Sequence, residues 1–248
     1  MNYYEQIFKR KSFHLFRETE IISNEELEDI KAFSEGVTPL VSGIKTAVRI
    51  VTEQETTCKR GAQYCILFYS ERKGEYLQNI GYMGEQIDLY LASRNIGALW
   101  FGIGKPEQMT ADGLDFVIMI AIAKMPEEKF RKDMFKAKRK SMEEIWSGET
   151  PAYANIVRFA PSACNTQPWK IEYGNHQLMV YRYKKPGKRG IMPGDKVVYY
   201  NRIDIGILLL FLEVCLRQEG IAFEKELFSE LDDDLETVMV ARYMLAND

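Results

Sequence analysis

The hydrophobic residues of the chain recur with two different periods, and each period predicts one type of element. Short runs rich in β-branched and aromatic residues predict strands. These runs are Ala47–Glu53, Tyr64–Ser70, Phe116–Ala123, Trp169–Tyr173, Gln177–Tyr183 and Thr237–Leu245. The run Phe116–Ala123 is apolar on both faces, which is typical of a central strand. Gly174-Asn175 separates two of the runs and predicts a hairpin.

Other segments have the apolar spacing or the end signals of helices. They are Asn2–Phe8, a segment that runs from a Ser23 cap to about Gly36, Tyr76–Asn95, Ala152–Arg158 and Arg202–Gln218. Ser23 can cap its helix because acidic residues follow it in the first turn. The two long helices are expected to stop at Gly97 and Gly220, since glycine ends helices readily.

The order of these elements indicates one plan used twice. Each half would contain a short helix, a polar motif, strands, a long helix and a last strand. The stretch Trp146–Pro151 has the composition of a junction, and Y-E-Q-I at Tyr4–Ile7 matches Y-A-N-I at Tyr153–Ile156. We therefore predict an α+β protein with an internal duplication, a first half at residues 1–148 and a shorter second half at 149–248.

Composition narrows the class of protein further. The 248 residues are 46% hydrophobic with a net charge of −3, so a folded core is expected and nucleic-acid binding has little support. No basic segment followed by an apolar run opens the sequence, and Ile205–Leu212 is too short to cross a bilayer. The four cysteines form no C-x-x-C pair, and the two histidines lack partners at metal-ligand spacing. A soluble cytoplasmic protein without membrane, nucleic-acid or metal partners is expected.

One polar stretch, A-P-S-A-C-N-T-Q-P-W at Ala160–Trp169, stands directly before a predicted strand. Pro161 and Pro168 stiffen the backbone, while Ser162, Asn165 and Gln167 offer hydrogen-bond donors and acceptors. A planar heteroaromatic ligand with ring carbonyls and nitrogens would need that mixture. The same residues could equally close turns between a helix and a strand.

Three further segments are candidates for binding. Arg10-Lys11-Ser12 combines cations and a hydroxyl that suit a phosphate, although a basic helix end explains it as well. Lys138-Arg139-Lys140 has the same ambiguity, because most charge runs are solvated surface. Gly97, Ala98 and Gly102 would let a backbone approach a ligand, or they would simply follow the end of a helix.

Taken together, these segments resemble the FMN-dependent nitroreductase family. R-[RK]-S-x-[RK]-x-F is matched by Arg10–Phe16 except at His14, and A-P-S-x-x-N-x-Q-P-W by Ala160–Trp169. The family's glycine-containing helix end before a Trp is resembled by L-A-S-R-N-I-G-A-L-W at Leu91–Trp100. Lys138 and Lys140 match the family's K-x-[RK] pair. The A-P-S motif follows the long helix here, whereas in the common family it precedes that helix. The order resembles a branch of nitroreductases in which one chain carries two half-copies and mimics the family homodimer.

The resemblance implies a nitroreductase-like fold with one FMN site between the two halves of a monomeric pseudo-dimer. Since the first half lacks an A-P-S equivalent, a second site is not expected. The resemblance also implies an oxidoreductase that takes hydride from NAD(P)H and reduces a small nitroaromatic, quinone or similar acceptor, with flavin-based chemistry and no catalytic side chain. The implied FMN-binding residues are Arg10, Lys11, Ser12, His14, Leu99, Trp100, Phe101, Gly102, Lys138, Lys140, Pro161, Ser162, Ala163, Asn165 and Gln167.

His14 departs from the family pattern, which usually has Arg or Lys at that position. A histidine is only partly charged near neutral pH, so we hypothesise a flavin that is harder to reduce and has a pH-dependent midpoint. A flavin-binding protein without reductase activity, acting as a carrier or sensor, is therefore an alternative, as is a flavin-free pseudo-enzyme on the same fold. The basic loop Pro186–Lys196 could cover the site or be a mobile surface loop.

Overall fold

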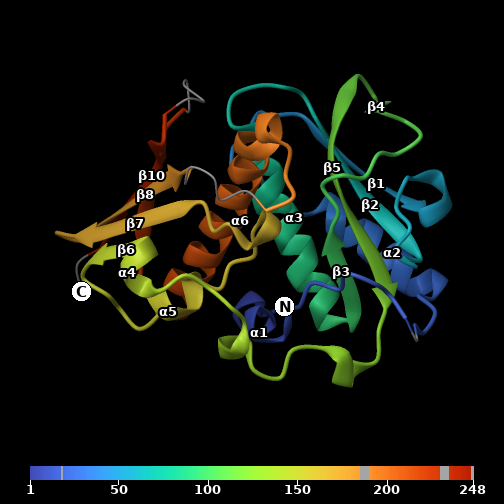
Figure 1. The fold of residues 1–248 in the computed structure, drawn as a ribbon, viewed down its shortest axis with the longest axis horizontal. Coiled ribbons are helices and arrows are strands. Elements are labelled where there is room, and N and C mark those ends of the chain that lie inside the picture. The colour runs from blue at the N-terminus through green and yellow to red at the C-terminus, as the bar shows by residue number, and fades with distance from the viewer. Residues whose placement is uncertain (18, 185–189, 230–234, 247–248) are drawn as a thin grey trace. The chain divides into compact units, whose positions relative to one another are not determined.

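The computed structural model describes residues 1–17, 19–184, 190–229 and 235–246, which form helices and sheets of an α+β protein (Figure 1). Residues 186–189 of the basic loop lie outside the described residues. The chain divides into two compact units, Met1–Met134 and Phe135–Asp248. This division comes before the expected one after residue 148. Lys138 and Lys140 therefore belong to the second unit, not to the first.

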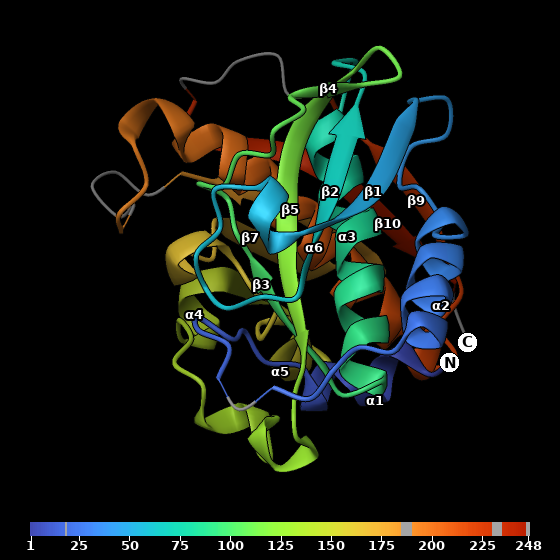
Figure 2. The same cartoon turned by 90° about the vertical axis from the view of Figure 1, so that its right-hand side faces the viewer.

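The first unit is an antiparallel sheet with helices beside it (Figure 2). Its elements are α1 (Tyr3–Lys9), α2 (Asn24–Glu35), β1 (Thr46–Thr52), β2 (Tyr64–Ser70), α3 (Tyr76–Ser93), β3 (Ile96–Trp100), β4 (Thr110–Ala111) and β5 (Leu114–Lys124), with single-turn 3-10 helices at Glu53–Glu55 and Glu127–Lys129. The strand order is β1-β2-β5-β3, and β4 pairs with β5. The capping box expected at Ser23 is present, because the Ser23 hydroxyl accepts from the Glu26 N–H and the Glu26 carboxylate accepts from the Ser23 N–H.

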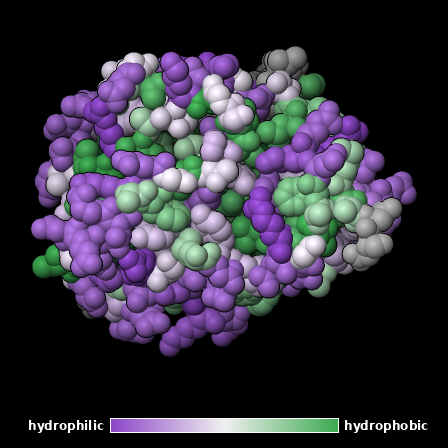
Figure 3. Space-filling model, turned by 180° about the vertical axis from the view of Figure 1, so that it is seen from behind, coloured by the Kyte–Doolittle hydropathy of each residue, from purple (hydrophilic) through white to green (hydrophobic). Residues whose placement is uncertain are grey.

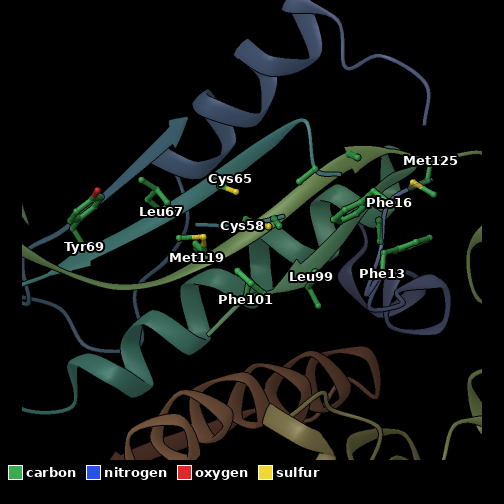
Figure 4. Close-up of a cluster of buried hydrophobic side chains, with 14 of the residues drawn as sticks. Phe13, Phe16, Cys58, Cys65, Leu67, Tyr69, Leu99, Phe101, Met119 and Met125 are labelled. Atoms are coloured by element: carbon green, nitrogen blue, oxygen red, sulfur yellow. The ribbon is translucent and has the colours of Figure 1, made fainter. Parts of the chain in front are cut away.

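The core of this sheet follows from the alternation of side chains along β2. Cys65, Leu67 and Tyr69 contribute to a buried cluster that also contains Phe13 and Phe16 (Figure 4). The intervening residue Phe68 points to the other face, where its ring stacks with that of Trp100. Both faces of the sheet are therefore covered, which explains why β5 is apolar on both sides.

The second unit is built around another sheet and another long helix. Its elements are α4 (Met142–Ile145), β6 (Trp146–Gly148), α5 (Ala154–Val157), β7 (Trp169–Gly174), β8 (Gln177–Tyr183), α6 (Val197–Gln218), β9 (Phe223–Leu227) and β10 (Thr237–Leu245), with 3-10 helices at Ala163–Asn165 and Gly194–Lys196. A further 3-10 helix, Met134–Lys136, lies where the units join in sequence. The strand order is β6-β7-β8-β10-β9, in which only the β6–β7 pairing is parallel among the described strands.

The two units repeat one topology. The order β1-β2-β5-β3 in the first corresponds to β7-β8-β10-β9 in the second, with α3 and α6 as the equivalent long helices. In this alignment α5 corresponds to α2, because each precedes a loop and the first of the matched strands, β1 or β7. The sequence match between Tyr4–Ile7 and Tyr153–Ile156 therefore paired the wrong helices. The predicted internal duplication of an α+β fold is confirmed.

Matching hydrogen bonds support the repeat within each unit. Asn79 of α3 accepts from the backbone N–H of Leu40 at 2.7 Å, and Asp204 of α6 accepts from that of Ala163 at 2.9 Å. The A-P-S loop thus has a counterpart around Leu40, in the first unit. That counterpart contains Pro39 but no equivalent of N-x-Q-P-W. We expected the first half to have no equivalent of the A-P-S motif. The sequence motif is indeed absent there, but a loop in the equivalent position is present.

Several predicted boundaries differ from the observed ones. Helix α3 ends before Asn95, which takes the left-handed conformation with φ 58°, while Gly97 lies inside β3. Gly220 has φ 72° after α6, as predicted. The hairpin turn is formed by Asn175 and His176, both with positive φ, rather than by Gly174-Asn175. The predictions missed β3, β4, β6 and β9, and β6 lies within the segment interpreted as a junction.

The surface is predominantly polar on the face drawn in Figure 3, where hydrophobic side chains gather in smaller patches. Among the described residues, no helix combines the length and apolar character required to cross a membrane.

Candidate functional site

The Arg10-Lys11-Ser12 motif lies beside the first residues of β3. Ser12 forms a parallel bridge with Ala98, and the Phe13 N–H donates to the Ala98 carbonyl at 3.0 Å. Gly97 makes this approach possible, because a Cβ there would stand 2.8 Å from the Phe13 ring. Two segments that the sequence separates by more than eighty residues are thus joined in the first unit.

Arg10 is held inside the first unit rather than exposed at a helix end. Its Nε donates to Asp88 Oδ2 at 2.8 Å, and its Nη2 donates to Ser12 Oγ at 3.3 Å. Glu85 Oε1 lies 3.2 Å from the same Nε. Burial alone would lower the pKa of Arg10, but attraction to Asp88 and Glu85 raises it above its ordinary value. Arg10 is therefore a firmly charged side chain with a carboxylate partner.

Trp100 is hydrogen-bonded to the same carboxylate as Arg10, that of Asp88. Its Nε1 donates to Asp88 Oδ2 at 3.0 Å. Gly84 leaves the room for this indole, since a Cβ at that position would stand 2.5 Å from the Trp100 ring. Burial raises the pKa of Glu85 well above its ordinary value, and the nearby Arg10 opposes this only in part. The neutral form of Glu85 is therefore favoured.

The remaining predicted residues of the first unit lie in different surroundings. Lys11 Nζ donates to the Lys129 carbonyl at 2.9 Å, and His14 is exposed. Leu99 and Phe101 are members of the buried cluster, so their side chains are core residues (Figure 4). Gly102 is partly buried.

The A-P-S-A-C-N-T-Q-P-W loop of the second unit has an unusual backbone. Cys164, Asn165 and Gln167 have φ values of 50°, 54° and 45°, a region that side-chain-bearing residues rarely occupy. Such a conformation persists only where the surroundings fix it. Ser162 Oγ accepts from the Gln167 N–H at 2.9 Å, which closes the loop on itself. Pro161 is buried at its start.

Lys138, Arg139 and Lys140 fix this loop from one side. Lys140 donates through its N–H to Gln167 Oε1 at 2.9 Å and through Nζ to the Gln167 carbonyl at 2.8 Å. Arg139 Nη1 donates to Asn165 Oδ1 at 3.0 Å, and Asn165 Nδ2 donates to the Lys138 carbonyl at 3.1 Å. The structure therefore brings the predicted Lys138 and Lys140 together with the predicted Asn165 and Gln167. Sequence reasoning placed Arg139 in a candidate cationic cluster but did not predict that it would hold Asn165.

Asp204 of α6 fixes the loop from the other side through its bond from the Ala163 N–H. Its Oδ1 makes that bond, whereas Oδ2 is buried with no hydrogen-bond partner among the described residues. Burial raises the pKa of Asp204 well above its ordinary value, and the Ala163 bond only partly opposes this. Sequence reasoning missed Asp204. The available signal was a carboxylate within the otherwise apolar run Ile203–Leu212.

The predicted site residues thus form two groups, one in each unit. The first contains Arg10, Ser12 and Trp100, which meet through Asp88. The second contains Lys138, Lys140, Ser162, Ala163, Asn165 and Gln167. In the part of the chain that the structure describes, no three His, Cys, Asp or Glu residues are placed to hold a metal ion.

Comparison with known proteins gives a family and a fold. The model of the family described as “Putative TM nitroreductase” matches residues 2–215. The crystal structure of a “putative nitroreductase” from Thermotoga maritima has a TM-score of 0.61 at 19% identity, covering 99% of this chain and 94% of that one. A nitroreductase family protein from Clostridium difficile gives 0.46 at 15% identity, with 61% of this chain and 100% of that chain covered. None of the curated proteins matches.

Proposed function

The chain belongs to the “Putative TM nitroreductase” family, and from this premise we propose that it is an FMN-dependent oxidoreductase with one flavin site per chain. NAD(P)H would be the reductant, and a nitroaromatic, a quinone or a similar small molecule would be the acceptor. Bound FMN would supply the two-electron chemistry that links these partners. The protein would bind and orient the flavin through its two groups of residues.

The observation that carries this proposal is the fixed conformation of the A-P-S loop. Bonds from Lys140, Arg139 and Ala163 hold its left-handed residues in place, so the strain is maintained by surrounding contacts. Strained backbone held in this way is typical of binding sites. The amides of Asn165 and Gln167 use part of their capacity inside the loop, and an amide retains further donors and lone pairs for a ligand.

The donor set of both groups suits FMN. Arg10 and Ser12 in the first group, and Lys138 and Lys140 in the second, would supply charge-assisted bonds of the kind that hold a phosphate. Ser162, Ala163 and Asn165 would face the flavin ring and ribityl chain. The exposed Lys138 is free to move toward an anion, because its bond to Asn165 is made by its carbonyl and leaves its ammonium group uninvolved.

Reconstitution with FMN tests this proposal directly. We expect a retained flavin absorbance after dialysis, and oxidation of NADH or NADPH that depends on an added nitroaromatic or quinone. Lys138→Ala should raise the Kd for FMN by about 2- to 5-fold, the range of an exposed charge contact. Lys132→Ala removes another exposed lysine, from the first unit, and should leave the Kd unchanged. Equal effects of both substitutions would contradict the assignment of Lys138.

A flavin-binding protein without reductase activity is the second candidate function. The exposed His14, which replaces the cation of the family pattern, favours it because a reduced flavin would be less stabilised by charge. Retained FMN together with NAD(P)H oxidation that no acceptor accelerates would favour this candidate over the reductase.

A further inference from the structure

One carboxylate oxygen in the first unit joins two segments that are distant in sequence. Asp88 Oδ2 accepts from Arg10 Nε at 2.8 Å and from Trp100 Nε1 at 3.0 Å. Asp88 is only 1% exposed, so water does not compete for these bonds. Arg10 then continues to Ser12 through Nη2. The arginine, its neighbouring hydroxyl and β3 are consequently fixed to α3 at a single point.

We propose that Asp88 is a positioning residue that holds Arg10 by its Nε so that the opposite edge of the guanidinium, beside Ser12, receives the phosphate of FMN. This inference rests on the proposed function. A guanidinium has five N–H donors in a rigid plane. The described bonds use the Nε–H and one hydrogen of Nη2, so three of the five donors remain for a ligand. Because the guanidinium is rigid, a bond that fixes one edge of its plane also sets the direction of the opposite edge.

Two carboxyl groups lie near Arg10, and Asp88 rather than Glu85 orients its guanidinium. Glu85 Oε1 lies 3.2 Å from Nε, but neither of its oxygens has a hydrogen-bond partner among the described residues. Burial raises the pKa of Glu85 and so favours its neutral form. Asp88 is thus the counter-ion and the orienting acceptor, while Glu85 fills the space behind them.

The repeat within the chain shows which bond is special to the first unit. Asp88 and Trp100 are 12 residues apart, and so are Glu213 and Lys225, whose carboxylate and ammonium group bond at 2.8 Å. The helix carboxylate that binds the following strand is therefore common to both units. Glu213 also accepts from Tyr243 and from Arg217, which lies one turn further along the same helix. Asp88 differs because the arginine that it binds, Arg10, lies outside its helix and beside Ser12.

FMN and riboflavin, which differ in the phosphate, separate positioning from simple structural support. Asp88→Asn keeps an acceptor for Arg10 but removes the charge that strengthens the bond, so it should raise the Kd for FMN by about 10-fold and leave the Kd for riboflavin within about 2-fold. Glu85→Gln makes the same change of side-chain type one helical turn away and should leave both constants unchanged. Equal weakening of both ligands by Asp88→Asn, or none, would overturn the inference.

Arg10→Lys changes the donor of the same hydrogen bond, and it is the alternative test if the Asp88→Asn variant does not fold. It keeps the positive charge but lacks the Nε–H that Asp88 holds, so the preference for FMN over riboflavin should again be lost. A preserved preference would overturn the inference. Wild-type protein that binds neither flavin would refute the proposed function itself. Wild-type protein that prefers FMN, together with an Asp88→Asn variant that keeps this preference, would refute only the positioning role.

Discussion

Replacing Asp204 with asparagine should alter how the stability of the protein depends on pH. Asp204 is 3% exposed, its Oδ1 accepts from Ala163, and its Oδ2 has no partner among the described residues. Asparagine has the same shape and can still accept the Ala163 bond. The chain already uses this solution in its first unit, where Asn79 accepts from Leu40. Asp204→Asn therefore removes a titration and keeps the loop anchor.

The sign of the effect follows from the direction of the pKa. Burial raises the pKa of Asp204 in the folded protein above the value of about 3.9 expected in the unfolded chain. The stabilisation by the retained proton is fully present below about pH 4 and is lost as the pH rises toward the folded-state pKa. Over that window the free energy of unfolding of the wild type should fall relative to Asp204→Asn by about 1.4 kcal/mol per pH unit.

Urea unfolding at pH 4.5, 5.5 and 6.5 would measure this difference. Glu85, whose pKa is raised in the same direction, is present in both proteins and cancels from the comparison. Asp204→Ala is the contrasting variant, because it leaves the Ala163 N–H without its acceptor and should cost about 1–3 kcal/mol relative to Asp204→Asn. Parallel stability profiles for wild type and Asp204→Asn would refute the reasoning, since they would mean that Asp204 is ionised in the folded protein.

Two further changes test other parts of the account. His14→Arg should raise the midpoint potential of the bound flavin, because a guanidinium places a permanent positive charge where the family pattern usually has Arg or Lys. Spectroelectrochemical titration that finds the same midpoint in both proteins would disprove the hypothesis. Gly97→Ala should lower the Tm and weaken FMN binding, since the new Cβ would meet the Phe13 ring at 2.8 Å, whereas Gly36→Ala meets its nearest atoms at 3.7 Å and should be tolerated. Equal Tm changes in these two glycine variants would contradict the packing argument.

The sequence pattern predicted the regular parts of the fold well. The bounds of β2 and β10 agree with the predicted runs, because aromatic residues mark β2 and β-branched residues mark β10. Strand β3 was missed for a physical reason. It has five residues, it includes Gly97, and it begins directly after the left-handed Asn95, so its residues had the composition of a helix end. Its strand conformation is imposed by pairing with β5.

The binding motifs were identifiable from sequence, whereas the residues that hold them were not. Arg10 and Gln167 belong to recognisable motifs. Asp88 and Asp204 are single carboxylates in long helices, and helix periodicity normally assigns such residues to a solvated face. Both helices are buried nearly all round, so their polar residues face protein instead. This burial depends on tertiary packing that local periodicity does not encode.

The number of flavins bound per chain tests the central claim most directly. Purified protein would be saturated with FMN and dialysed, and the flavin absorbance would be compared with the protein concentration. One FMN per chain is the predicted result, since one Arg-Ser group and one A-P-S loop are present. Two FMN per chain would contradict the assignment of a single site, and none would mean that both groups serve only the fold.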